Sequence, residues 1–278
     1  MQYFARLITL ALVFLLPVII HAKPVERVIS LAPHATELAY SAGLGDKLIA
    51  ASDHSDYPEQ AKQLERVANY QGIKLERIIT LQPDLIIAWP NGNPSKELEK
   101  LKKLGFTIFE TKAHSLTEIA NSVEALSQYA EDPSIGINNA NVFRRELISL
   151  KKTYSTNKKV PYFYKLSASP IITIAQKGWP SEVFQFCGGS NIFADSATPY
   201  PQVGIEQVVL RRPEVIFTSR HAVMDNGQWA KWHQQIPAVG KEQVWSLNAS
   251  WINRPTMRSL QAIVQVCDYF EQARNTIE

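Results

Sequence analysis

The sequence has little of what nucleic-acid binding, metal binding or the common kinds of catalysis require. Its formal net charge is only +3, and no run of Lys or Arg exceeds two residues. It contains no G-x-S-x-G elbow, no phosphate-binding glycine loop, and no H-E-x-x-H or C-x-x-C pair. The six histidines, at 21, 34, 54, 114, 221 and 233, lack metal-ligand spacing. These absences favour a binding protein that is not an enzyme, does not bind nucleic acid and has no metal site, although a Ser/His/Asp triad assembled only in three dimensions stays an alternative.

Cysteine is also scarce, since only Cys187 and Cys267 occur. In an exported protein an even pair is more often bridged than free, whereas two buried thiols are expected in a reducing compartment. A bridge between them would close a loop of about 80 residues and stabilise the fold by roughly 4 kcal/mol. The compartment therefore decides which of the two states to expect.

Charge is nearly absent from residues 1–22, where Arg6 is the only charged side chain. A nearly unbroken apolar run from Leu7 to Ile20 follows it, and the small residue Ala22 comes next. This pattern predicts a secretory signal peptide over 1–22 and a mature chain that begins at Lys23. The run is shorter than the roughly 20 apolar residues of a membrane-spanning helix, so an uncleaved anchor is the weaker alternative. Export favours the disulfide.

Short apolar runs alternate with longer amphipathic ones along the mature chain. This alternation is typical of βαβ units and parallel sheets, and it predicts an α/β fold. Strands are predicted at Val28–Leu31, Leu48–Ala51, Leu85–Trp89, Val160–Leu166 and Ile171–Ala175, and helices at Thr36–Ala42, Leu75–Leu81, Ser95–Leu104 and Leu116–Tyr129.

The alternation is interrupted by a helical pattern from about Ile135 to Tyr154 that contains no Pro or Gly after Gly136. A helix of about 20 residues is about 30 Å long, which is enough to connect two lobes as a stiff strut. We therefore expect an N-terminal lobe at 23–132, a linking helix at 133–158 and a C-terminal lobe at 159–278.

An internal repeat supports two similar lobes. One copy runs from Leu75 to Ile79 and then from Pro83 to Ile87, and the other copy runs 205–209 and then 213–217. In both copies a Glu stands seven residues before a Pro-acid pair, and an apolar run follows directly. Each copy predicts a short helix, a stop enforced by proline and a buried strand.

The glutamates of this repeat, Glu76 and Glu206, have two interpretations. A carboxylate in the first turn of a helix is favoured by the helix dipole. One acidic residue at the same place on each lobe would also present two charges on one molecular face. Such a pair could bind two arginines of a partner with twofold symmetry.

Several aromatic residues stand where a ligand would bind. Trp89 lies at the carboxyl end of a predicted parallel strand, and ligands of open α/β sheets bind outside the carboxyl ends of the strands. Tyr70, Tyr200 and Trp251 are predicted in loops. Aromatic faces with a polar rim suit a large, flat, partly apolar ligand. Alternatively, such side chains cover the edges of the lobes.

Two polar residues are further candidates. His54 follows a predicted strand and is either a ligand contact or a solvated loop residue. Arg254 could hold amide or phosphate oxygens of a ligand, or cap a helix that begins after Pro255.

The chain also contains short segments that occur together in a known family. They are Leu31-Ala32-Pro33, Thr36-Glu37, Ser55-Asp56-Tyr57-Pro58, Gln71-Gly72, Leu75-Glu76-Arg77-Ile78, Pro83-Asp84-Leu85-Ile86-Ile87-Ala88-Trp89, Cys187-Gly188-Gly189, Asn191-Ile192-Phe193, Pro201-Gln202-Val203 and Glu206-Gln207-Val208. Across nearly the whole mature chain they resemble the periplasmic cobalamin (vitamin B12)-binding proteins. This family belongs to a wider group that binds siderophores, haem or cobalamin for ABC importers.

The resemblance implies two Rossmann-like lobes with parallel sheets, joined by one long rigid helix. It implies a monomer in the periplasm that binds cobalamin as its transported ligand, has no other cofactor, and delivers it to an ABC permease and ATPase complex in the inner membrane. It assigns docking on the permease to Glu76 and Glu206 and a disulfide to Cys187 and Cys267. It assigns ligand contact to His54, Tyr70, Trp89, Tyr200, Ser250, Trp251, Ile252, Asn253 and Arg254.

Some positions depart from the family pattern, which has Tyr at His54, Trp at Tyr70 and Tyr200, and Asp at Ser250. A protein of the same fold that binds haem or a ferric siderophore is therefore an alternative, in which His54 or a tyrosine would ligate iron. A secreted hydrolase is the alternative of another class.

Overall fold

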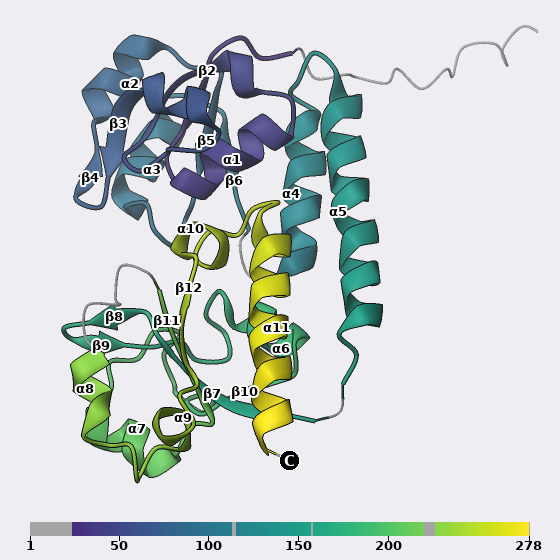
Figure 1. Ribbon diagram of the computed structural model, residues 1–278. Helices are drawn as coiled ribbons and strands as arrows, with labels where there is room; N and C mark the ends of the chain where they lie inside the picture. Colours follow the sequence, from purple (N-terminus) through teal and green to yellow (C-terminus); the bar gives the residue numbers. More distant parts are fainter. Residues whose placement is uncertain (1–23, 113–114, 157, 220–225, 278) are drawn as a thin grey trace, which may run out of the picture.

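The computed structural model describes residues 24–112, 115–156, 158–219 and 226–277. The predicted signal peptide, 1–22, lies outside these residues. Two α/β lobes lie one above the other, with long helices along one side of the molecule (Figure 1). Within the described ranges, no helix combines the length and the apolar character needed to cross a membrane.

The first lobe is built on a six-stranded sheet in the order β4-β3-β2-β1-β5-β6, in which every pairing is parallel except that of β3 with β4. Its central strands β1 and β5 are buried along their whole length, as expected for a parallel sheet between two helical layers. The strands are β1 (Val28–Ser30), β2 (Leu48–Ser52), β3 (Glu65–Asn69), β4 (Gly72–Ile73), β5 (Leu85–Ala88) and β6 (Ile108–Glu110). The helices are α1 (Pro33–Ser41), α2 (Leu75–Leu81), α3 (Ser95–Lys103) and α4 (Leu116–Ser127), with short 3₁₀ turns η1 (Gly45–Lys47) and η2 (Glu59–Gln63).

The second lobe is built on a four-stranded parallel sheet in the order β10-β7-β11-β12. Its strands are β7 (Val160–Lys165), β10 (Gly189–Asn191), β11 (Val215–Ser219) and β12 (Val244–Leu247). Its helices are α6 (Ser181–Phe186), α7 (Ile205–Arg211), α8 (Asn226–Ala230), α9 (Pro237–Gly240), α10 (Ala249–Ile252) and α11 (Ser259–Ile277). The predicted α/β fold with two parallel sheets is confirmed.

The strand predicted at Ile171–Ala175 is wrong in length and in kind. Only Ile171–Ile172 forms a strand, β9, and it pairs antiparallel with β8 (Ser167–Ala168) in a separate two-stranded sheet. The amides of Thr173 and Ala175 instead donate to the carbonyls of Pro201 and Pro199, at 3.1 and 2.9 Å. The apolar run is therefore held against a loop and does not join the parallel sheet.

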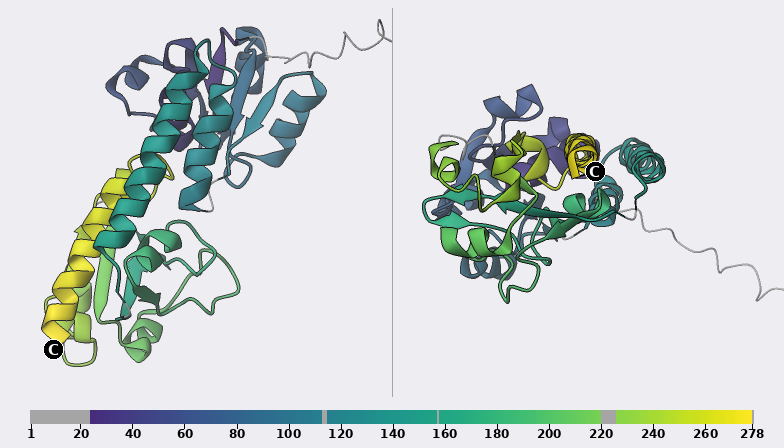
Figure 2. Two further views of the ribbon diagram at one scale, coloured as in Figure 1. Left: turned by 90° about the vertical axis from the view of Figure 1, so that its right-hand side faces the viewer. Right: turned by 60° about the horizontal axis from the view of Figure 1, so that its bottom comes forward.

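The predicted linking helix is α5 (Pro133–Thr153), which has 21 residues. It begins at a proline, and the Asp132 carboxylate before it accepts a hydrogen bond from the amide of Ser134 at 2.9 Å. Lys151 and Lys152 in the last turn complement the helix dipole. The helix runs beside α11 and extends from one lobe to the other (Figure 2).

One apolar cluster is continuous through both lobes. It includes Ala35 and Leu126 of the first lobe, Phe143 of α5, and Tyr162 and Phe270 of the second lobe, all of which are fully buried. Two smaller clusters cover the opposite faces of the two sheets. Because interiors pack as densely as crystals of organic molecules, a shared core makes the two lobes and α5 one mechanical unit.

The internal repeat has the same backbone in both lobes. The helices α2 and α7 each have seven residues and end at a left-handed residue, Gln82 with φ 47° and Arg212 with φ 46°. After the proline, the amide of Asp84 donates to the carbonyl of Arg27, just before β1, at 2.8 Å. The amide of Glu214 likewise donates to the carbonyl of Pro161, near the start of β7, at 2.9 Å. The predicted helix, stop and buried strand are confirmed in both copies.

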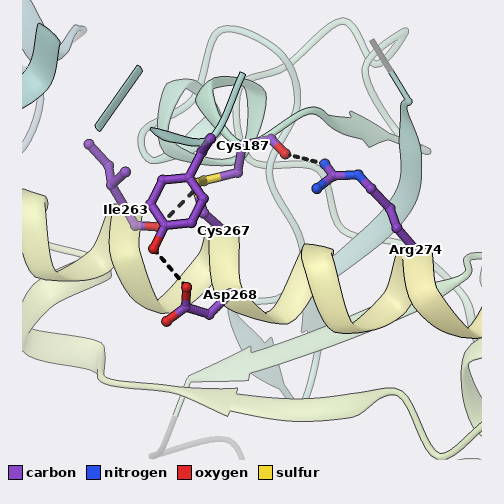
Figure 3. Close-up of a disulfide and its surroundings, with 6 residues drawn as sticks. Cys187, Ile263, Cys267, Asp268 and Arg274 are labelled. Atoms are coloured by element: carbon purple, nitrogen blue, oxygen red, sulfur yellow. Dashed lines mark hydrogen bonds between the residues drawn. A yellow bond between two sulfur atoms is a disulfide. The ribbon is translucent and has the colours of Figure 1, made fainter. Parts of the chain in front are cut away.

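The second lobe also holds the predicted disulfide. Cys187, which follows α6, is bonded to Cys267 in the middle of α11, and both residues are buried (Figure 3). Nearby, Arg274 donates to the Cys187 carbonyl at 2.5 Å, and the Tyr154 hydroxyl donates to Asp268 at 2.7 Å. These bonds connect α6, α11 and the end of α5.

Candidate ligand-binding cleft

A cavity of about 660 Å³ lies between the two lobes. Its volume lies within the range of roughly 300–1,000 Å³ found for small-molecule sites. The first lobe contributes Pro33, His34, Trp89 and Asn91; the second contributes Leu166, Lys177, Trp179, Pro199 and Tyr200; and the segment before α11 contributes Asn253, Arg254 and Pro255.

Trp89 forms part of the upper wall because it directly follows β5. Its amide donates to the side-chain oxygen of Asn93 at 2.7 Å, and the side-chain amide of Asn93 donates to the Leu31 carbonyl at 2.8 Å. A Cβ atom at Gly92 would come within 2.0 Å of the indole ring. The loop thus fixes the ring at the carboxyl edge of the sheet, where ligands of α/β proteins bind.

His34 lies beside this tryptophan, near the beginning of α1. The two rings meet edge to face with centroids 5.3 Å apart, and the imidazole Nε2 lies 3.0 Å from the hydroxyl of Thr111. Only 5% of the residue is exposed. Burial, assisted by the positive charge of Arg254, lowers the pKa of His34 to about 4. The ring is therefore neutral at neutral pH.

The second lobe supplies the opposite aromatic wall. The Trp179 indole donates to the carbonyl of Ile252 at 3.0 Å, which fixes that ring. A Cβ atom at Gly178 would lie 2.5 Å from the carbonyl oxygen of Pro199 and 3.3 Å from the ring of Tyr200. Glycine therefore permits this close approach. Tyr200 remains about half exposed, so part of its ring is free to contact a ligand.

Charged residues connect the lobes at one end of the cavity. Glu37 of α1 is only 4% exposed, and it accepts hydrogen bonds from Arg258 at 2.8 and 2.5 Å and from Arg254 at 3.2 Å. Arg254 also donates to Asp56 at 2.6 Å and to the His54 carbonyl at 3.0 Å. We call Glu37, Asp56, Arg254 and Arg258 the charged clasp.

Asp56 is ionised within the clasp. Burial raises its pKa, but the hydrogen bond from Arg254 and the charges of Arg254 and Arg258 lower it by more, so the pKa of Asp56 falls below its usual value. Arg254 does not cap a helix, because α11 begins only at Ser259 and the guanidinium is bonded to carboxylates. The helix-cap interpretation of Arg254 is therefore wrong.

A second polar contact joins the lobes through α6. The Glu182 carboxylate accepts a hydrogen bond from the amide of Leu116, at the beginning of α4. Burial raises the pKa of Glu182, and the nearby charge of Glu118 adds to this effect, although the bond from Leu116 opposes it. Asp56 and Glu182, which both take part in contacts between the lobes, therefore have pKa values shifted in opposite directions.

The cavity brings together four of the residues predicted from sequence, namely Trp89, Tyr200, Asn253 and Arg254. His54 is exposed with φ 62°, and its carbonyl contacts the clasp. Tyr70 is 93% exposed in the turn between β3 and β4, which lies on the side of the first lobe facing the second (Figure 1). Neither side chain lines the cavity.

The remaining predicted residues, Ser250, Trp251 and Ile252, lie outside the cavity wall. The prediction that Trp251 lies in a loop is wrong, since residues Ala249–Ile252 form α10. This short helix forms because the Asn248 side chain accepts a hydrogen bond from the amide of Ser250 at 3.0 Å. Ile252 is fully buried and supplies only its carbonyl, to Trp179.

Eight residues that line the cavity were not predicted from the sequence, namely Pro33, His34, Asn91, Leu166, Lys177, Trp179, Pro199 and Pro255. For two of them, His34 and Trp179, the sequence holds a usable signal. His34 comes soon after the first predicted strand, so its position at a carboxyl end could have indicated it. Trp179 stands between Gly178 and Pro180, a setting like the one that singled out Tyr200 between two prolines.

The two glutamates of the repeat are exposed in the first turns of α2 and α7, away from the cavity. Across the described ranges, no group of three His, Cys, Asp or Glu residues could hold a metal ion.

Comparison with known proteins identifies the family of the chain. A family model for periplasmic binding proteins matches residues 28–249. The vitamin B12-binding protein of Vibrio parahaemolyticus serotype O3:K6 is 64% identical over 252 residues, which cover 91% of this chain and 92% of that protein.

Two solved structures are also similar. The crystal structure of the periplasmic vitamin B12 binding protein BtuF of Vibrio cholerae superposes with a TM-score of 0.88 at 57% identity, covering 91% of this chain and 99% of that one. The periplasmic heme-binding protein RhuT from Roseiflexus sp. RS-1 has a TM-score of 0.79 at 19% identity, covering 89% and 98%. The second similarity shows that the fold is shared, and it does not identify a ligand.

Proposed function

This chain belongs to the periplasmic binding protein family, and we propose that it binds cobalamin (vitamin B12) in the cleft between its lobes. It performs no chemistry on the vitamin and delivers it to an ABC permease and ATPase complex in the inner membrane. The observation that carries this proposal is a cavity with aromatic walls from both lobes, Trp89 on one side and Trp179 and Tyr200 on the other. Such walls suit a large, flat, partly apolar ligand. A relative named for vitamin B12 binding, at 64% identity, supports the choice of ligand.

The same proposal covers the organisation of the chain. Residues 1–22 direct export and are removed. The mature protein then consists of a lobe at 23–132, a linking segment at 133–158 and a lobe at 159–278. The proposed contacts with the vitamin are the cavity residues together with the nearby His54, Tyr70, Ser250, Trp251 and Ile252.

Calorimetric titration of the mature protein tests the ligand. Cyanocobalamin should bind, whereas haemin and a ferric siderophore should not. Trp89→Leu should weaken cyanocobalamin binding at least about tenfold, since losing a buried aromatic contact costs on the order of 1.5–3 kcal/mol. The matched control is Trp245→Leu, because Trp245 stacks on Tyr269 at 4.7 Å and does not line the cavity. Binding of haemin but not of cyanocobalamin would overturn the proposal, as would turnover of an ester or phosphate substrate.

We further propose that Glu76 and Glu206 dock on the permease. They occupy the same exposed place on the two lobes, which is suited to pairing with two arginines of a symmetric partner. The double variant Glu76→Arg/Glu206→Arg should abolish uptake in proteoliposomes that contain the permease and ATPase, while cyanocobalamin affinity stays unchanged. Glu146→Arg with Glu271→Arg reverses two other exposed charges and is the control. Unchanged uptake by the first variant would show that its glutamates only favour their helices.

A further inference from the structure

The hydrogen bonds around His34 determine which of its ring nitrogens carries the proton. The Thr111 hydroxyl lies 3.1 Å from the carbonyl oxygen of Ala88 and 3.0 Å from Nε2 of His34. The hydroxyl has only one hydrogen. If that hydrogen goes to the Ala88 carbonyl, Nε2 must carry the ring proton and donate to the hydroxyl, and both contacts are hydrogen bonds. In the opposite arrangement the Ala88 carbonyl keeps the bond that it accepts from the Thr111 amide at 2.9 Å, but its oxygen and the hydroxyl oxygen lie 3.1 Å apart with no hydrogen between them. The first arrangement is therefore favoured. Nδ1 therefore carries a lone pair.

This lone pair is open to the cavity. No residue in the described part of the chain forms a hydrogen bond with Nδ1. Nδ1 is nevertheless not one of the fully buried polar atoms without a hydrogen-bond partner, so it retains some exposed surface. The residue is 95% buried, and the space that it borders is the cavity. A pKa of about 4 keeps the ring neutral, so the lone pair persists at neutral pH. His34 thus presents an acceptor, held in place by Thr111 and by the edge of Trp89.

We propose that Nδ1 of His34 accepts a hydrogen bond from an N–H of the ligand, and that this contact selects a primary carboxamide over a carboxylate. The proposal rests on the proposed function and makes it more specific, because cobalamin carries carboxamides around its ring whereas haem carries carboxylates. An amide can donate to the lone pair. A carboxylate at neutral pH has no hydrogen to donate and would place its own lone pairs against Nδ1.

Two cations also line the cavity, and they act differently from His34. Arg254 is bonded to Glu37 and Asp56 of the charged clasp, and Lys177 is exposed at the rim. Neither occupies the pocket between α1 and Thr111 that holds the imidazole. Selection by His34 is therefore local, and it applies to the one ligand group that faces this ring.

Isomeric ligands can test a local contact. Hydrolysis of one peripheral carboxamide of cyanocobalamin gives several isomeric monocarboxylic acids, which can be separated. At neutral pH, the mature protein and its His34→Phe variant are titrated with cyanocobalamin and with each acid. Phenylalanine keeps a ring against Trp89 and removes both nitrogens. The unsubstituted protein should bind cyanocobalamin at least about tenfold more tightly than one of the acid isomers. This ratio corresponds to the free-energy cost of leaving a buried polar group unpaired. In His34→Phe that ratio should fall to near one, while cyanocobalamin affinity falls about tenfold.

The ratio separates recognition from a structural role, because a structural defect would weaken amide and acid alike. Thr111→Val is the second variant. It keeps the imidazole but removes the hydroxyl that fixes the proton on Nε2, and it should reduce the same ratio in part. An unchanged ratio in His34→Phe, or equal weakening of all ligands, would overturn the role of His34 alone. Imidazole ligation of cobalt, seen in the absorption spectrum of bound aquocobalamin and lost in His34→Phe, would also overturn it. Failure of the unsubstituted protein to bind cyanocobalamin would overturn the proposed function as well.

Discussion

The two lobes share one backbone plan but are stabilised in different ways. Both contain the same helix, left-handed end, proline and buried strand, at α2–β5 and at α7–β11. The first lobe has a sheet of six strands and no cysteine, whereas the second has a sheet of four and a disulfide between α6 and α11. The smaller sheet is thus accompanied by the covalent link. The comparison indicates that one backbone plan, beside a shared core, is supported by different local means, more strands in the first lobe and a covalent link in the second.

Removing the disulfide tests this difference most strongly. Cys187→Ala/Cys267→Ala should lower the free energy of unfolding by up to about 4 kcal/mol, because the link closes a loop of 80 residues. Hydrogen exchange followed by mass spectrometry should show faster exchange in α6 and α11 and little change in α1 and β2. An equal increase in both lobes would show that the disulfide does not act locally in the second lobe.

The contact between the lobes is the next target. Glu37→Gln leaves Arg254 and Arg258 without their shared buried carboxylate, which should cost about 3 kcal/mol in urea unfolding. Glu26→Gln is the matched control, because the Glu26 side chain is largely exposed and its pairing with Lys47 should contribute less than about 1 kcal/mol. If both variants lost the same stability, the clasp would be no more than a surface ion pair.

The contributions of Asp56 and Glu182 to stability should respond to pH with opposite signs. The folded pKa of Asp56 is lowered, so its contribution is present above the usual carboxyl pKa and is lost as the pH falls. The folded pKa of Glu182 is raised, so its contribution is present at low pH and is lost as the pH rises through that pKa. Asp56→Asn should therefore be less stable than the parent near pH 7 but not near pH 3. The stability of Glu182→Gln relative to the parent should increase as the pH rises from 3 to 7. Each change in the free energy of unfolding should stay below about 1 kcal/mol. Melting temperatures across this range provide the measurement, and shifts of the same sign would contradict the assignment.

The smallest effect concerns the repeat itself. Gln82 and Arg212 adopt left-handed backbone angles that glycine adopts without strain. Arg212→Gly should stabilise the protein by about 0.5 kcal/mol, since relief of about 1–2 kcal/mol is offset in part by the entropy of glycine in the unfolded chain. Gln82→Gly should gain less, because it also removes the hydrogen bond that the Gln82 side chain donates to the Ile79 carbonyl at 2.6 Å. Thermal unfolding measures both gains, and a larger gain for Gln82→Gly would contradict this expectation.

Much of the fold was predictable because local signals agreed. For α2, helical periodicity and Pro83 place the helix at Leu75–Leu81, as the structure has it. Trp89 was found because it directly follows a buried strand at the edge where ligands bind. The strand at Ile171–Ala175 was mispredicted because a short apolar run does not reveal what it pairs with.

The clasp could not be predicted, because it depends on residues far apart in the sequence. Arg254 lies 217 residues from Glu37, and neither position has a local pattern that indicates the other. The lone pair of His34 was hidden for the same reason, since it depends on Thr111, which is 77 residues away. Local patterns thus predicted the elements, while the polar contacts of the cleft required the tertiary structure.

The core shared by the two lobes has a practical consequence for biosensor design. Sensors made from binding proteins commonly convert a hinge motion into energy transfer between two attached dyes. Here the lobes, α5 and α11 share one packed interior, so dyes attached to the two lobes should keep nearly the same separation when the ligand binds. A sensor based on this scaffold should therefore use a reporter inside the cleft, such as the emission of Trp89 or Trp179, because a ligand there should change their surroundings even if the separation of the lobes stays the same.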